Sequence, residues 1–259
     1  MTSAEPAIEL VEAVSQTEGR TLIDGITLTL GAGRILGVTG LDGCGKSALL
    51  DLMSTLVQPR AGSIRLFGQD TEAIGESGRR RLRLEIGVVF EEGALLDGFT
   101  VAENMELPLA RRGLAREEVA LRIEHWLTEL ELTEHRDRMP YQLSTSLIRR
   151  TALARALVTG PKLLICDEVT TGLDLGAILA FTRMLRRLRA EQGTTIVLAV
   201  DDLAQLKRLA DEVAVLNAGR LAFQGDFARL CDQRMEDPVL RAIFDDEVWS
   251  TAFPAAASP

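Results

Sequence analysis

The chain has 259 residues, of which 46% are hydrophobic and 26% charged, and its formal net charge at pH 7 is −9. This composition is that of a folded chain with a sizeable core, so it excludes disorder for most of the length. The acidic balance argues against nucleic acid as a partner, because a phosphate backbone would meet a repelling overall field. No run approaches the ~20 apolar residues of a membrane helix, and the first residues lack the layout of a secretory signal. We therefore expect the chain to stay in the cytosol.

The predicted elements begin with strands, because apolar and polar residues alternate in the first part of the chain. The third strand runs into a glycine-rich turn that opens a helix. A second pair of strands is expected after that helix. The predicted strands lie at 8–14, 22–30, 34–38, 63–67 and 86–90, and the helix at 47–56.

Helices dominate the next segment, which reads as an insertion within a sheet-bearing core. Almost wholly apolar runs, typical of parallel strands buried on both faces, then alternate with helices. The overall prediction is an α/β fold. Helices are predicted at 101–109, 117–130, 147–158, 176–190 and 203–209, and strands at 162–166, 195–200, 212–216 and 221–224.

The glycine-rich turn matches the phosphate-binding loop pattern, in the required setting between an apolar strand and a helix. Its glycines let successive backbone N–H groups face a phosphate, Lys46 supplies a positive charge, and Ser47 is a ligand for Mg²⁺. We call residues 40–47 the P-loop and expect them to bind Mg²⁺–ATP. It reads Gly40, Leu41, Asp42, Gly43, Cys44, Gly45, Lys46 and Ser47.

Two neighbouring carboxylates, Asp167 and Glu168, end an apolar run at 162–166. In an open α/β sheet, ligands gather at the carboxyl ends of the strands, so these residues are expected near the P-loop. Asp167 is then a candidate Mg²⁺ ligand, and Glu168 a candidate base that polarises the attacking water. A lone acidic pair would usually be a solvated strand end, but the P-loop makes the functional interpretation stronger.

Together with these motifs, the segment 170–174 makes the chain closely resemble the ABC ATPases, over nearly its whole length. Residues 140–144 and 149–157 look like the family's signature segment and the helix that follows it. The resemblance implies an ABC ATPase fold, with a RecA-like parallel-sheet core, an antiparallel β subdomain and a helical insertion. It also implies one nucleotide-binding domain at 1–245, with a helical subdomain at about 97–158, and a tail at 246–259.

In this family two ATPase subunits enclose ATP, and each P-loop faces the signature of the partner. The resemblance therefore places Ser144 on the nucleotide of a second subunit, which is the same or a different chain. Within the family, residues 90–96 and 100–109 resemble the ATPases of Mla/MCE lipid transport. This finer resemblance implies an integral-membrane permease, a phospholipid or other hydrophobic cargo, a place on the cytoplasmic face of the inner membrane, and room for a small regulatory subunit.

The signature and the Q-loop depart from the family pattern. Where relatives have two glycines after Ser144, this chain has Thr145 and Ser146, which put side chains where a helix N-terminus approaches phosphate. Glu91 stands in place of the Q-loop glutamine; it keeps an oxygen for Mg²⁺ but adds a negative charge. The aromatic residue that stacks on adenine in many relatives has no counterpart near 16–19.

The fourth departure is Asp201, which occupies the position of the catalytic histidine. A histidine can donate to the γ-phosphate, whereas an ionised carboxylate only accepts. The chain's two histidines, His125 and His135, fall in the helical insertion and cannot take that role. We therefore predict a transporter ATPase that binds Mg²⁺–ATP but hydrolyses it slowly or only with an unlike partner. The alternatives are normal activity through adapted geometry, a regulatory pseudo-ATPase, and a soluble ABC ATPase without a transport role.

Overall fold

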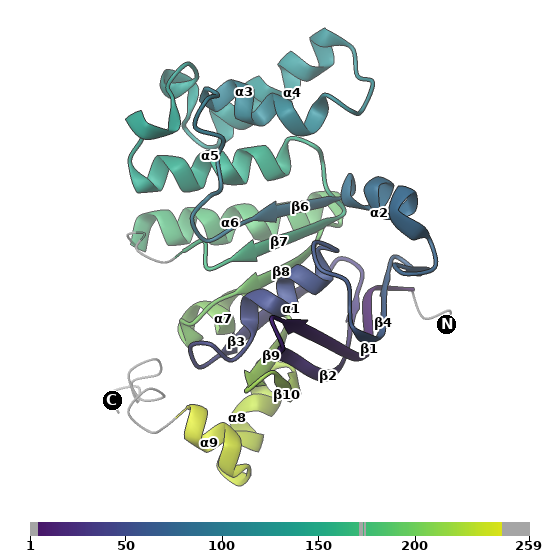
Figure 1. Ribbon diagram of the computed structural model, residues 1–259. Coiled ribbons are helices and arrows are strands. Elements are labelled where there is room, and N and C mark those ends of the chain that lie inside the picture. The colour runs from purple at the N-terminus through teal and green to yellow at the C-terminus, as the bar shows by residue number, and fades with distance from the viewer. Residues whose placement is uncertain (1–4, 171–172, 174, 245–259) are drawn as a thin grey trace, which may run out of the picture.

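The computed structural model describes residues 5–170, 173 and 175–244. An antiparallel sheet, a mainly parallel sheet and a block of helices can be followed in Figure 1. Within the described ranges, no helix combines the length and the apolar character needed to cross a bilayer. The predicted α/β class, with a parallel-sheet core, an antiparallel sheet and a helical insertion, is confirmed.

The antiparallel sheet has the strand order β2–β1–β4–β5. Strands β1 and β2 form a long hairpin whose turn contains Glu18 and Gly19, both with positive φ. Along β2, the side chains of Ile26, Leu28 and Leu30 are buried and alternate with the exposed Thr27 and Thr29, as the sequence predicted. The strands are β1 (Pro6–Thr17), β2 (Arg20–Gly31), β4 (Ala61–Leu66) and β5 (Gln69–Asp70).

The second sheet has the order β10–β9–β3–β8–β7–β6 and is parallel except for the edge strand β10. Because parallel strands end at one edge of a sheet, the residues that follow β3, β8, β7 and β6 form a row there. The strands are β3 (Ile35–Gly40), β6 (Ile86–Val89), β7 (Leu163–Asp167), β8 (Thr195–Ala199), β9 (Glu212–Asn217) and β10 (Arg220–Gly225).

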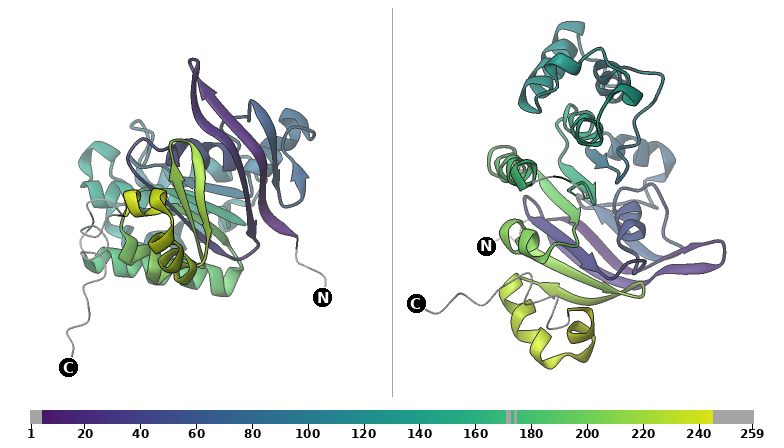
Figure 2. Two further views of the ribbon diagram at one scale, coloured as in Figure 1. Left: turned by 90° about the horizontal axis from the view of Figure 1, so that it is seen from below. Right: turned by 90° about the vertical axis from the view of Figure 1, so that its left-hand side faces the viewer.

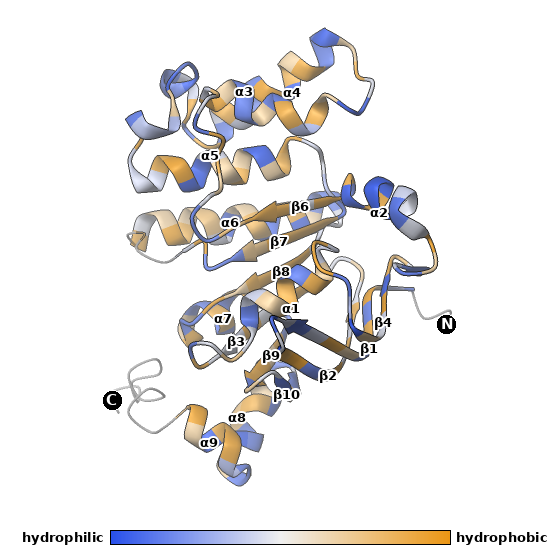
Figure 3. Ribbon diagram, in the orientation of Figure 1, coloured by the Kyte–Doolittle hydropathy of each residue, from blue (hydrophilic) through white to orange (hydrophobic). Residues whose placement is uncertain are grey.

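The parallel sheet divides the hydrophobic core in two, because alternate residues of each strand face opposite sides. Leu36 and Val38 of β3 pack with α1 (Lys46–Met53) and the antiparallel sheet. Ile35 faces the other way, toward α6 (Leu175–Gln192) and α7 (Leu203–Leu209). Strands β6, β7 and β8 are accordingly coloured mainly as hydrophobic in Figure 3.

The helical block lies beyond β6 and β7, at the top of Figure 1 and of the right-hand view in Figure 2. Its contact with the sheet runs mainly through α5, which packs on β6. It contains α3 (Val101–Glu106), α4 (Arg116–Glu129), α5 (Thr145–Leu157) and short 3₁₀ turns at Leu107–Leu109, Thr133–His135 and Pro140–Gln142.

Two expectations about local structure were wrong. The strands at 63–67 and 86–90 do not pair with each other: β4 joins the antiparallel sheet beside β1, and β6 joins the parallel sheet beside β7. Between them lies α2 (Gly75–Arg83), whose arginine-rich sequence has too few apolar residues to signal a helix. After β10, where no further element was predicted, the chain forms two helices, α8 (Phe227–Glu236) and α9 (Pro238–Ile243).

Candidate functional site: a phosphate-binding loop beside paired carboxylates

The P-loop is a strand-to-helix turn that leaves the end of β3 and enters α1 at Lys46. The amide of Cys44 donates to the carbonyl of Leu41, which closes the turn. The amide of Gly219 donates to the carbonyl of Cys44 over 2.8 Å, so the turn between β9 and β10 supports the loop from outside. The strand, glycine loop and helix predicted from the sequence are therefore present in this order.

Two of the loop glycines are required by the backbone. Gly45, the N-cap of α1, has φ 109, and a Cβ there would lie 2.8 Å from the carbonyl oxygen of Leu22. Gly40 has φ 151, and a Cβ there would lie 2.3 Å from the carbonyl oxygen of Leu216. Side chains at these positions would push the loop away from β2 and β9. The glycine pattern thus reflects close backbone packing as well as access for a phosphate.

The strand order brings the predicted site residues to one edge of the sheet. Strand β8 lies between β3 and β7, so Asp201, just after β8, sits between the P-loop and the acidic pair. Glu91 follows β6, the next strand of the row. The acidic pair was expected near the P-loop, and the two strands that lead to them, β3 and β7, are separated in the sheet by β8 alone. The neighbours of β3 are β9 and β8, and Asp201 follows β8.

Lys46 is the centre of the site and is almost fully buried. Its Nζ donates to the carbonyl oxygen of Gly40 over 3.2 Å. It also lies 2.8 Å from Oδ1 of Asp201 and 3.6 Å from Oε1 of Glu168. Burial lowers the pKa of Lys46, but the hydrogen bond and charge of Asp201 more than offset this, so the net shift of the pKa is upward. The lysine is therefore held in its charged form by carboxylates of its own chain.

Glu168 has the properties expected of a proton acceptor in a buried site. Burial raises its pKa, and the negative charge of Asp201 raises it further, while Lys46 acts in the opposite direction. Its backbone has φ 46, a left-handed conformation that is uncommon outside glycine. Such strained backbones cluster at functional sites, which supports the assignment of Glu168 as the candidate base.

Asp167 fits the role of a magnesium ligand. Its Oδ1 is buried and has no hydrogen-bond partner among the described residues, so this carboxylate has an oxygen to spare for a cation or its water. The described part of the chain contains no group of three or more acidic, histidine or cysteine side chains that could hold a metal ion by itself. Mg²⁺ in nucleotide-binding proteins usually has only one or two protein ligands, and substrate phosphates and water supply the others. Ser47, exposed at the start of α1, and Glu91, exposed after β6, are the other donors for such a site.

The signature segment lies on the helical block, away from the P-loop of the same chain. Ser144 is the N-cap of α5, and its side chain accepts a hydrogen bond from the amide of Leu147 over 3.4 Å. Thr145, the first residue of the helix, is exposed and carries its side chain at the helix N-terminus. Of the segment at 170–174, residues 171, 172 and 174 lie outside the described residues.

Two polar contacts near the site were missed by the sequence analysis. Thr170 donates from Oγ1 to Oε1 of Gln205, a buried residue of α7. Arg155 of α5 donates to the carbonyl oxygens of Gly93 and Ala94, which ties the signature helix to the segment after Glu91. In the sequence, Gln205 is recognisable only as a polar residue on the apolar face of a predicted helix. That pattern does not identify Thr170 as its hydrogen-bond partner.

Cys44 lies just before the N-terminus of α1, a position that can lower the pKa of a thiol and make it reactive. Burial raises its pKa, although the charge of Lys46 acts against that shift. The thiol is almost wholly buried, so its role is to fill space inside the P-loop. This outcome favours the packing interpretation over an oxidation-sensitive site.

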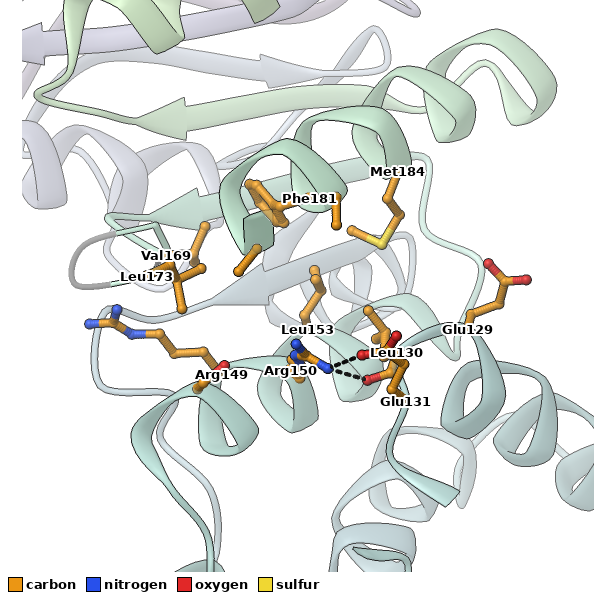
Figure 4. Close-up of a pocket in the computed structure, with 13 residues that line it drawn as sticks. Glu129, Leu130, Glu131, Arg149, Arg150, Leu153, Val169, Leu173, Phe181 and Met184 are labelled. Carbon is orange, nitrogen blue, oxygen red and sulfur yellow. Dashed lines mark hydrogen bonds and ion pairs between the residues drawn. The ribbon is translucent and has the colours of Figure 1, made fainter. Parts of the chain in front are cut away.

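A separate cavity of about 140 Å³ lies between α5 and α6 (Figure 4). Its lining includes Leu153, Val169, Phe181 and Met184, while Arg150 at its rim is ion-paired with Glu131 over 2.6 Å. None of the P-loop residues and none of the carboxylates around Lys46 line it. The cavity is therefore distinct from the nucleotide site and marks an incompletely packed joint between the helical block and the core.

Comparison with known proteins agrees with this geometry. Residues 23–171, more than half of the chain, match the family model described as ABC transporter. A solved dimeric structure of an ATP-binding cassette in a post-hydrolysis state, bound to ADP and phosphate, superposes with a TM-score of 0.79 at 25% identity, over 85% of this chain and 98% of that one. An ATPase of Clostridium perfringens that is part of an ABC transporter complex has the same fold, with a TM-score of 0.77 at 24% identity, over 95% of this chain and 94% of that one.

Among curated proteins, the chain is 36% identical over 236 residues to the methionine import ATP-binding protein MetN of Caulobacter vibrioides, covering 91% of this chain and 71% of that protein. It is 36% identical over 222 residues to a second such protein, of Pseudomonas putida, covering 85% of this chain and 66% of that one. These names give no support to the expected Mla/MCE subfamily. The relatives and the geometry show that the chain belongs to the ABC transporter family, as an ATP-binding, ATP-hydrolysing subunit.

Proposed function

We propose that this subunit binds Mg²⁺–ATP at the P-loop and hydrolyses it slowly, or depends on an unlike partner subunit for hydrolysis. The observation that carries the proposal is the convergence of Lys46, Glu168 and Asp201 within 4 Å at the carboxyl edge of the parallel sheet. The P-loop amides and Lys46 bind the phosphates, and Glu168 polarises the attacking water. Ser47, Asp167 and Glu91 hold Mg²⁺, which supplies positive charge to the phosphate oxygens when it is bound.

Slow hydrolysis follows from two features of the site. Asp201 cannot donate a hydrogen bond to the transferred phosphate as a histidine can, and its charge opposes the negative charge of the phosphate. Thr145 places a β-branched side chain at the N-terminus of α5, where relatives have glycine against the partner's nucleotide. The first feature acts on this chain's own P-loop and the second on the P-loop of its partner, so both sites of a dimer are affected.

The test compares steady-state ATP turnover before and after the combined changes Asp201→His, Thr145→Gly and Ser146→Gly. We expect turnover to rise by about tenfold or more, because a donor to the phosphate is regained and the helix N-terminus is cleared. Equilibrium binding of ATP, measured in parallel, separates a slow enzyme from a chain that does not bind nucleotide. Equal turnover in the two proteins would contradict slow hydrolysis and favour an adapted but normally active site.

The subunit works with an integral-membrane permease and with a second ATPase subunit, which is the same or a different chain. We place it on the cytoplasmic face of the inner membrane, held there by the permease. The family membership supports this arrangement, and it disfavours a soluble ABC ATPase without a transport role. Co-purification with a polytopic membrane protein tests it, and a small regulatory subunit would be recovered in the same experiment.

For the cargo, we propose a small solute of the amino-acid type, because the relatives at 36% identity are named as methionine import proteins. The second candidate is a phospholipid or other hydrophobic cargo, which the resemblance of residues 90–109 to Mla/MCE ATPases favours. The permease contacts the cargo, so identifying the co-purified permease and measuring methionine uptake in a deletion strain decide between them. Normal methionine uptake together with an altered lipid distribution would overturn the first candidate.

A further inference from the structure

We propose that Asp201 is a specificity residue that occupies the phosphate-binding position at Lys46 and makes the site select a nucleoside diphosphate over a triphosphate. The inference rests on the proposed nucleotide-binding function and deepens it. It starts from the ion pair of 2.8 Å between Nζ of Lys46 and Oδ1 of Asp201. In a nucleotide-loaded P-loop, the lysine binds the β- and γ-phosphate oxygens. In this structure the carboxylate of Asp201 contacts Lys46 in the position that a phosphate oxygen would take.

Lys46 has little binding capacity left in this arrangement. An ammonium group has three donors. One donates to the carbonyl of Gly40 and one to Asp201, while Glu168 supplies a second negative charge at 3.6 Å. The lysine side chain is only 6% exposed, so it cannot turn toward solvent to meet a ligand. A phosphate oxygen that binds Lys46 must therefore compete with the carboxylates of Asp201 and Glu168 for the positive charge of the lysine.

The backbone fixes Asp201 where it can make this contact. On one side, the amide of Val200 donates to the carbonyl of Val38 over 3.0 Å, which ties the end of β8 to β3. On the other side, Asp202 caps α7 and accepts from the amides of Ala204 and Gln205. Asp201 is the single residue between these two anchors. Its side chain is half exposed, so it can swing toward solvent once a ligand takes its place.

The two nucleotides differ in how far they depend on Lys46. A diphosphate presents only its β-phosphate to the lysine, and the backbone amides of the P-loop bind that phosphate as well, so a diphosphate depends less on Lys46. A triphosphate adds a γ-phosphate on the side of the site where Asp201 and Glu168 lie, and it must compete for the lysine against both carboxylates. Asp201 thus weakens the binding of a triphosphate more than that of a diphosphate. The subunit therefore retains the diphosphate, which is the product of hydrolysis, until the assembled transporter moves Asp201.

The experiment measures the affinities of the full chain for ADP and for the non-hydrolysable β,γ-imido analogue of ATP by calorimetry, at one fixed Mg²⁺ concentration. The variants are Asp201→Asn and, as a second test of the same charge, Asp201→Ser. Asp202→Asn is the matched control: it removes the same charge one residue along, and asparagine caps a helix as well as aspartate does. Circular dichroism and thermal melting confirm that each variant is folded.

We expect both Asp201 variants to raise the affinity for the triphosphate analogue by about tenfold and the affinity for ADP by less than about threefold. The preference changes because a negative charge close to the γ-phosphate is lost. Asp202→Asn should leave the ratio of the two affinities as in the unmodified chain. An unchanged ratio in the Asp201 variants, or an equal change in Asp202→Asn, overturns the inference while leaving the nucleotide-binding function in place. The absence of binding of either nucleotide to every folded variant overturns both.

Discussion

The ammonium nitrogen of Lys46 lies 3.6 Å from Oε1 of Glu168, so the residue proposed to polarise water is also an ion-pair partner of the phosphate-binding lysine. Without nucleotide, the carboxylate of Glu168 helps to neutralise the charge of Lys46. With nucleotide bound, the phosphates neutralise the lysine instead. The same exchange applies more strongly to Asp201, whose carboxylate is closer to the lysine.

Replacing Glu168 by glutamine should separate binding from hydrolysis. We expect turnover to fall by about 10² or more, because the amide cannot accept the proton of the attacking water. ATP affinity should stay equal or increase, since one negative charge near the phosphates is removed. Turnover and calorimetric binding are the measurements, and the exposed neighbour of Glu91, changed as Glu92→Gln, is the control. Full turnover in Glu168→Gln would exclude this residue as the base.

Gly45→Ala should destabilise the P-loop more than Gly43→Ala. Both glycines have positive φ, which costs an alanine roughly 1–2 kcal/mol. Only at Gly45 would the new Cβ also meet a backbone atom, the carbonyl oxygen of Leu22 at 2.8 Å, whereas Gly43 has open space around it. Thermal melting of the two variants measures the difference. Equal melting temperatures would show that the loop shifts freely away from β2.

Asn104→Ala should unfold the segment in front of α3. The side chain of Asn104 is fully buried; its Oδ1 accepts from the amide of Leu96, and its Nδ2 donates to the carbonyls of Leu96, Phe99 and Thr100. The carbonyls of Leu96 and Thr100 also accept from the backbone amides of Phe99 and Asn104. Removing the side chain therefore costs mainly the partners of the Leu96 amide and the Phe99 carbonyl, about 2–3 kcal/mol.

Chemical denaturation measures this loss, with Glu106→Ala on the exposed side of the same helix as the control. Amide exchange should speed up most at residues 96–100. A loss of stability no larger than that of Glu106→Ala would mean that the hydrogen bonds of Asn104 do not hold the segment.

The three cysteines should differ in their reaction with iodoacetamide. Burial raises the pKa of Cys44 and, still more, that of the fully buried Cys166, so the reactive thiolate is scarce at both near pH 7.5, a value well below the ordinary thiol pKa of about 8.5. Burial also raises the pKa of Cys231, but this residue is partly exposed. We expect labelling of Cys231 first and of all three only after denaturation, as read by mass spectrometry. Rapid labelling of Cys44 in the folded chain would contradict its packing role.

The local patterns of the sequence determined the elements that carry function. The P-loop was predictable because its glycines, Lys46 and Ser47 are contiguous and lie between a strand and a helix, and the acidic pair ends a strand that is apolar throughout. The family followed from these motifs together. Each of these features depends on neighbours in the chain, which is why the sequence displays them.

Only the tertiary structure decided which residues meet at the site. The sequence does not contain the strand order, and it is this order that inserts β8 between β3 and β7 and brings Asp201 to within 2.8 Å of Lys46. It also sends β4 and β6 to different sheets, although only β5 and α2 lie between them in the chain. Pairing between distant segments is set by the burial of whole faces of a sheet, and no local pattern records which faces meet.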